Sequence, residues 1–124
     1  MGQRVLMPTA NVNITGTNAS IDQYRTVTGG SAHIIINMLA VPGIQSVSFK
    51  LQGKDALGNY YDIGLVSAAI LGVSQTVLKI GIGMLAAANL VVNDSLPDVW
   101  RVVGTHTGAG VFQYNVCMND LSLN

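Results

Sequence analysis

The stretch IQSVSFKLQGKDALGNYYDIGL, residues 44–65, decides the fold class of this chain. In its first half, the apolar residues Val47, Phe49 and Leu51 alternate with polar residues, which is the pattern of a strand with one buried face. A loop rich in turn-forming residues follows, and the alternation then resumes toward Leu65. These two segments therefore predict an antiparallel β-hairpin.

The same period of two recurs over much of the remaining chain. Strands are predicted at His33–Val41 and Thr76–Ile82, and a second hairpin is predicted around the connection Gly104–Gly110. Because alternating long helices are missing, the sequence predicts an all-β fold, an antiparallel β-sandwich or barrel. The side chains with inward parity form the predicted core, which comprises Phe49, Leu51, Ile63, Leu78, Ile80, Trp100, Val102, Tyr114 and Val116.

Two segments depart from this period. The stretch Gly83–Asn89 contains methionine, leucine and three alanines, so we expect at most one short helix, located there. Residues 1–20 have few apolar side chains, and they predict an extended N-terminal arm or an edge segment. An arm of this kind would become ordered on contact with a partner. A single β-sandwich domain is predicted for residues 21–124.

Charge is scarce in this chain. Six basic and six acidic residues are present among 124, while 49% of the residues are hydrophobic. A free soluble domain normally has about a quarter charged residues. Uncharged polar side chains or protein contacts must therefore cover the surface, which favours a chain that belongs to an assembly. Because basic and aromatic residues are not interleaved and the net charge is zero, no nucleic-acid partner is expected.

No membrane span or export signal is predicted. The most apolar stretch, Ile80–Val92, has thirteen residues, fewer than the roughly 18–20 that a membrane helix needs. The residues from Arg4 to Pro8 lack an apolar run of signal-peptide length, so we expect synthesis in the cytoplasm. The single cysteine, Cys117, excludes an internal disulfide and is predicted to be a buried strand residue; a free thiol or an intermolecular bridge remains open.

One string resembles a cofactor-binding motif. Gly81–Ala86 matches the dinucleotide pattern G-x-G-x-x-A, and Asp98 follows downstream. A dinucleotide site needs a parallel sheet built from several βαβ units, and the chain has no room for them after Ala86. Flexible turn glycines at the end of a strand explain the string as well, so no cofactor is expected.

The other reactive side chains are isolated from one another in the sequence. The candidates are His33, His106, Asp55, Asp62, Asp94, Asp98 and Cys117. Metal ligation needs three or four convergent donors, and nucleophilic catalysis needs a base beside the nucleophile. The sequence shows neither arrangement. Asp55 and Asp62 form one pair near a predicted turn, and Asp94 and Asp98 form another; turn capping explains both pairs better than acid–base chemistry does. We therefore expect no enzyme activity and no catalytic, cofactor-binding or metal-binding residue.

Three segments carry a resemblance to a known group of proteins. They are FKLQGKDALGNYYDI (49–63), VLKIGIGMLAAANLVVNDSLPDVWRVVGTHTGAG (77–110) and FQYNV (112–116). These segments resemble small β-rich virion proteins of siphovirus-type tailed bacteriophages. The resemblance lies in the order of four motifs: a strand that ends in Gln-Gly-Lys-Asp, a Gly-Asn-Tyr-Tyr return, an Ala-Ala-Ala-Asn stretch, and Leu-Pro before Trp-Arg-Val. The resemblance covers Val47–Val116, about 70 residues, and its motifs are structural.

The resemblance implies a capsid decoration or cement protein, located on the outer capsid surface of the virion. Such a protein binds an icosahedral shell of major capsid protein and stabilises contacts between capsomers. The implied partners are the major capsid protein and copies of this chain, as a dimer or trimer at a capsid symmetry axis. Two alternatives remain, because sandwich folds host many functions. One is a phage tail or tail-tube accessory structural protein, and the other is a carbohydrate- or receptor-binding β-sandwich module.

Overall fold

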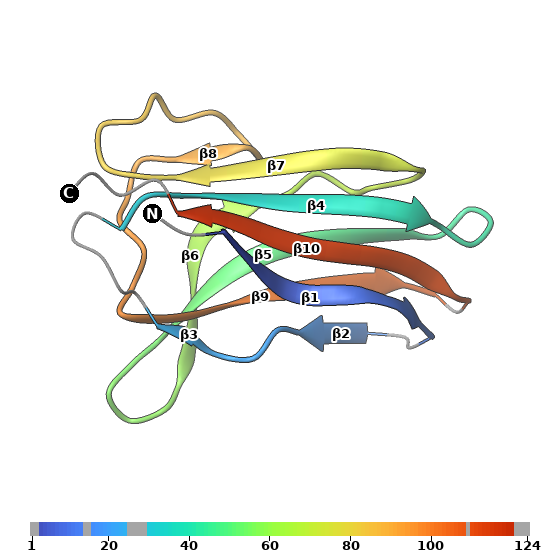
Figure 1. The fold of residues 1–124 in the computed structure, drawn as a ribbon, viewed down its shortest axis with the longest axis horizontal. Helices are drawn as coiled ribbons and strands as arrows, with labels where there is room; N and C mark the ends of the chain where they lie inside the picture. The colour runs from blue at the N-terminus through green and yellow to red at the C-terminus, as the bar shows by residue number, and fades with distance from the viewer. Residues whose placement is uncertain (1–2, 14–15, 25–29, 109, 121–124) are drawn as a thin grey trace.

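The computed structural model describes residues 3–13, 16–24, 30–108 and 110–120. These residues form ten β-strands in two sheets that pack face to face (Figure 1). In spatial order, sheet A contains β1 (Gln3–Val12), β10 (Phe112–Asp120), β4 (Ala32–Ala40), β7 (Ser74–Ile80) and β8 (Val91–Val92). Sheet B contains β2 (Gly16–Ala19), β9 (Val99–Thr107), β5 (Ser46–Lys54) and β6 (Tyr60–Val66), with β3 (Gln23–Tyr24) also paired to β9. The predicted all-β fold is confirmed, and it is a sandwich rather than a closed barrel.

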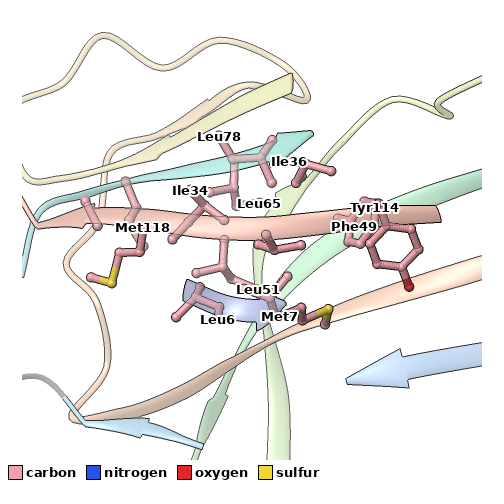
Figure 2. Packing of buried hydrophobic residues seen from close by; sticks show 14 of the residues in the cluster. Leu6, Met7, Ile34, Ile36, Phe49, Leu51, Leu65, Leu78, Tyr114 and Met118 are labelled. Atoms are coloured by element: carbon pink, nitrogen blue, oxygen red, sulfur yellow. The ribbon is translucent and has the colours of Figure 1, made fainter. Parts of the chain in front are cut away.

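The core lies between the two sheets and follows the alternation of the sequence. Every second residue of β5 and β10 is buried, as one apolar face per strand requires. Figure 2 shows how side chains from both sheets meet in this layer. Eight of the nine predicted core residues are buried. The exception is Ile63, which is half-buried and packs against the core from the edge strand β6.

One close approach inside the core depends on a glycine. A Cβ atom at Gly104 would lie 2.8 Å from the Phe49 ring, so only glycine leaves room for that ring. Phe49 then meets Tyr114 of the opposite sheet edge to face, with ring centroids 5.1 Å apart. This contact joins β5 to β10 through the middle of the sandwich.

The prediction of a hairpin around Gly104–Gly110 is wrong. The strands β9 and β10 follow each other in the chain but belong to different sheets, because β9 pairs with β5 and β2 while β10 pairs with β1 and β4. The alternation of apolar residues predicts which side of a strand faces the core, but not which strand it pairs with. Both β9 and β10 face the same core, so the pattern is the same whether they pair with each other or lie in opposite sheets. The hairpin of β5 and β6 is confirmed as an antiparallel pair.

The amino-terminal segment is not an arm beside the domain. Residues 3–12 form β1, which is an edge strand of sheet A and pairs antiparallel with β10. Leu6 and Met7 are buried in the core, so two apolar side chains anchor a segment that is otherwise polar. Of the two structures that the sequence allowed for this segment, an arm or an edge segment, the second is the one observed. Ser20 therefore does not mark the end of a separate structural unit.

The expectation of at most one short helix is confirmed, and Gly83–Asn89, the place where the sequence allowed one, contains none. This segment consists of turns that connect β7 to β8, and the described part of the chain contains no helix. Gly83 and Asn89 have φ angles of 87° and 63°, which a right-handed helix does not allow. Leu85 is 92% exposed, so a helix here would have lacked the packing that stabilises short helices.

Candidate functional site

His106 takes part in a buried network that links the two sheets. Its Nδ1 donates to the Gly16 carbonyl at 2.9 Å, and the Tyr114 hydroxyl donates to Nε2 at 3.0 Å. The amide Nδ2 of Asn18 donates to the same hydroxyl at 2.9 Å. Burial raises the pKa of the Tyr114 phenol. Both ring nitrogens are engaged inside the sandwich, so the network holds β2, β9 and β10 together. Asn18 and Tyr114 also line a small pocket of about 250 Å³ beside β1, whose other lining residues are mostly apolar.

The other reactive side chains that the sequence singled out lie apart. His33 is on the outer face of sheet A, where partial burial and then Lys79 lower its pKa. Asp94 lies in the connection from β8 to β9 and accepts from the Ser95 amide at 2.7 Å. Cys117 is partly exposed on β10, so its predicted burial is incomplete. Among the described residues, no three histidines, cysteines or acidic residues come together as metal ligands.

Asp55 caps the turn between β5 and β6, as turn capping predicts. Its Oδ1 accepts from the backbone amides of Asn59 at 2.8 Å and Leu57 at 2.9 Å, and these bonds lower the pKa of the carboxyl group. The dinucleotide-like string at 81–86 follows β7 but enters turns instead of a helix, so it offers no helix terminus to a phosphate group.

The outer face of sheet B holds five of the eleven described charged residues in one connected network. We call this the charge network, and its members are Asp22, Lys50, Gln52, Lys54, Tyr60, Asp62 and Arg101. At one side, Asp22 binds Lys54 at 2.8 Å and accepts from the Tyr60 hydroxyl at 2.6 Å. The Arg101 guanidinium lies 3.5 Å from the centre of the Tyr60 ring.

The network continues along the strands to its second carboxylate. Arg101 Nε donates to Gln52 at 2.9 Å, and Gln52 in turn donates to Asp62 at 2.9 Å. Lys50 lies 3.1 Å from the same carboxylate. Hydrogen bonds from Gln52 and Lys50 lower the pKa of Asp62, as those from Lys54 and Tyr60 lower the pKa of Asp22. Both carboxylates on this face are therefore paired with cations, and the network as a whole keeps only one excess positive charge.

The substitution Asp22→Asn is expected to destabilise the protein at neutral pH and to have less effect in acid. A folded-state pKa below the unfolded value of about 3.9 means that the carboxylate stabilises the fold above that pH, and that this contribution is lost as pH falls through the folded pKa. Urea unfolding of both proteins at pH 7 and near pH 3 measures the difference.

The matched control for this test is Asp94→Asn, which keeps an oxygen acceptor for Ser95. It is expected to change stability less than Asp22→Asn at pH 7. A gap between wild type and Asp22→Asn that stays constant down to pH 2 would show that the charge of Asp22 does not contribute.

The outer face of sheet A is organised in rows that run across four strands. The strand registers align Val5, Cys117, Ile35 and Val77, which we call the apolar row. On one side of it lies the amide row, which comprises Thr9, Asn115, Asn37 and Gln75. On the other side lies the mixed row, which comprises Gln3, Asn119, His33 and Lys79.

The amide row forms a continuous chain of hydrogen bonds. Gln75 donates to Asn37 at 2.9 Å, Asn37 donates to Asn115 at 2.9 Å, and Asn115 donates to Thr9 at 3.0 Å. Each donating amide has a second N–H that these bonds do not use. The row is therefore connected across the sheet by hydrogen bonds and still offers donors to a molecule above it.

A shallow groove of about 410 Å³ opens over these rows. Val5, Ile35, Asn37 and Cys117 are among the residues that line it. The outer face of an antiparallel sheet in a sandwich is normally polar, so an apolar row here departs from the usual pattern. Of the described side chains in the three rows, Lys79 alone carries a permanent charge.

Large apolar side chains are exposed on loops and strand ends toward both ends of the sandwich. The β4–β5, β6–β7 and β9–β10 loops lie at one end, which we call the apolar end (Figure 1). These loops and the end of β4 carry Leu39, Ile44, Leu71, Val73 and Val111, with exposed fractions from 43% to 95%. The β5–β6 and β7–β8 loops lie toward the opposite end (Figure 1). They carry Leu57, Ile82 and Leu85, with exposed fractions from 72% to 92%, and Ile21 in the β2–β3 connection is 78% exposed. Patches of exposed apolar surface commonly mark protein interaction sites.

Several contacts bring the loops of the apolar end together. A Cβ atom at Gly110 would lie 2.6 Å from the Pro42 ring, which places the β9–β10 loop against the β4–β5 loop. The bridge of Val47 with Ile70 brings the β6–β7 loop beside the start of β5. The described residues of these loops carry no charge.

Sequence reasoning anticipated a contact surface from the low charge but did not locate it. The rows on sheet A depend on the register of four strands, and the apolar end depends on which sheet each strand joins. The alternation of apolar residues along one strand predicts neither of these. The available signal was Ile35 and Val77, which are apolar at positions of outward parity.

Comparisons with known proteins add no assignment. The family models that were scanned give no match to this chain, and no curated protein matches it at a significant level. Within the described residues, no helix has the length and apolar character to cross a membrane.

Proposed function

We propose that this chain is a structural virion protein, a capsid decoration or cement protein that binds the outside of an icosahedral shell of major capsid protein. The observation that carries the proposal is the exposure of large apolar side chains on loops and strand ends toward both ends of the sandwich. A protein that stabilises contacts between capsomers has to bind more than one neighbour, and two apolar ends meet that requirement.

The charge distribution supports the same proposal. The charge network on sheet B pairs Lys54 with Asp22 and Lys50 with Asp62, which leaves one excess positive charge, and the chain as a whole has a net charge of zero. Copies of the chain can therefore lie side by side without strong repulsion. The many copies on a shell also allow weak individual contacts to add up. The resemblance of Val47–Val116 to small phage virion proteins supports the same assignment.

The substitution Ile44→Asp is expected to weaken attachment to undecorated capsids by about 10- to 100-fold. Burial of one large aliphatic side chain is worth about 1.5–3 kcal/mol, and the variant loses this contribution at the apolar end. Ile44 is 95% exposed in the free chain, so the fold should be unchanged. Co-sedimentation of purified protein with particles that lack it measures the affinity.

The control is Thr105→Asp, an equally charged change at an exposed position on the outer face of sheet B. This variant is expected to bind like wild type. Unchanged binding of Ile44→Asp would remove the apolar end from the attachment surface. Imaging of intact particles tests the assignment itself, because density on the tail instead of the head would identify a tail accessory protein.

A further inference from the structure

We propose that the outer face of sheet A pairs with the same face of a second copy, around a two-fold axis that runs along the apolar row. The inference goes beyond attachment to a capsid, because it concerns the free chain and a different surface. It starts from the apolar row, whose member Val5 is 62% exposed on a face that is normally polar in a sandwich.

A two-fold axis along this row makes the face complementary to itself. Each residue of the apolar row then meets its own counterpart, and the amide row of one copy meets the mixed row of the other. Such a dimer would be a sheet-on-sheet contact, in which aligned strands pack about 10 Å apart. The apolar row would be removed from water along its whole length.

The polar groups of the face also match under this symmetry. Gln75 of one copy faces Lys79 of the second copy, and its side-chain oxygen can accept from the ammonium group. Asn37 faces His33, and Asn115 faces Asn119, so amide donors meet acceptors. Lys79, the one permanent charge in the described rows, lies away from the axis. Arg4 also lines the groove, and its guanidinium donates to Gln23 at 3.2 Å.

The size of the face indicates a weak dimer. Four strands about 4.8 Å apart and five residues at about 3.4 Å each give roughly 300 Å² per copy. Standard stable interfaces bury about 1,200–2,000 Å² in total, counting both partners. The chain is therefore monomeric when dilute and dimeric at high concentration.

Sedimentation equilibrium of the purified chain, at concentrations up to millimolar, tests this pairing. Wild type is expected to show a concentration-dependent dimer, and Val5→Lys is expected to lose it, because two ammonium groups would face each other at the axis. Because Val5 is 62% exposed, Val5→Lys is expected to fold like wild type, and circular dichroism checks this. The matched control, Thr105→Lys on sheet B, is expected to dimerise like wild type.

A crosslinking measurement places the contact on this face. In a Cys117→Ser background, Val5→Cys is expected to give a crosslinked dimer with a short bismaleimide, and Thr105→Cys is expected to give none. A wild-type chain that stays monomeric up to millimolar concentration overturns the pairing, as does a Val5→Lys variant that dimerises normally. Capsid binding by Ile44→Asp concerns another surface, so either proposal can fail alone.

Discussion

A chain that lacks residues 1–12 is expected not to fold. The deletion removes β1 and with it the buried side chains of Leu6 and Met7. Truncation of one buried leucine or methionine typically costs about 2–5 kcal/mol, and the whole stability of a domain is only about 5–15 kcal/mol. The edge of β10 would in addition lose its pairing partner. Thermal melting followed by circular dichroism should show no cooperative transition.

Two substitutions in the same strand calibrate this result. Leu6→Ala is expected to remain folded but to lose about 2–5 kcal/mol, because it leaves a cavity in the core. Val5→Ala changes an exposed side chain and should stay within about 0.5 kcal/mol of wild type. If the truncated chain melts like the intact one, β1 does not contribute to the core and the segment is an arm after all.

The substitution Trp100→Ala is expected to lower the free energy of unfolding by about 3–5 kcal/mol. Trp100 is fully buried in β9, at the register position where this strand meets both Gln23 and Gly53. Loss of the indole would leave a large cavity between the sheets. Urea denaturation at neutral pH measures the change in unfolding free energy.

Trp100→Phe is the informative companion of this variant. It keeps an aromatic ring in the core and removes the indole N–H, which is buried without a hydrogen-bond partner in the described part of the structure. It is therefore expected to cost clearly less than Trp100→Ala. Equal losses for the two variants would mean that the N–H has a partner and that the ring itself contributes little.

Local patterns predicted the parts of this fold that depend on one strand at a time. Alternation in residues 46–52 gave β5 its buried face, and the turn-forming residues that follow gave the hairpin with β6. Turn chemistry also predicted the capping role of Asp55. In each case the side chains that decide the structure lie within a few residues of one another.

Intrinsic propensity and composition were misleading where distant contacts decide the structure. The alanines of 83–89 favour a helix, but glycine and asparagine conformations and the pairing of β8 with β7 impose turns instead. The polar composition of the first residues suggested an arm, but Leu6 and Met7 supply enough burial to make β1 part of sheet A.

The sequence by itself determined the all-β class, the inward parity of the main strands and the scarcity of charge, because period and composition are local properties. Only the tertiary structure decided that β9 and β10 belong to different sheets, since either pairing buries the same apolar side chains. It also decided the candidate surfaces. The apolar row joins Val5, Ile35, Val77 and Cys117 from four strands, and the apolar end joins loops far apart in the chain, because long-range register and sheet order set these neighbours.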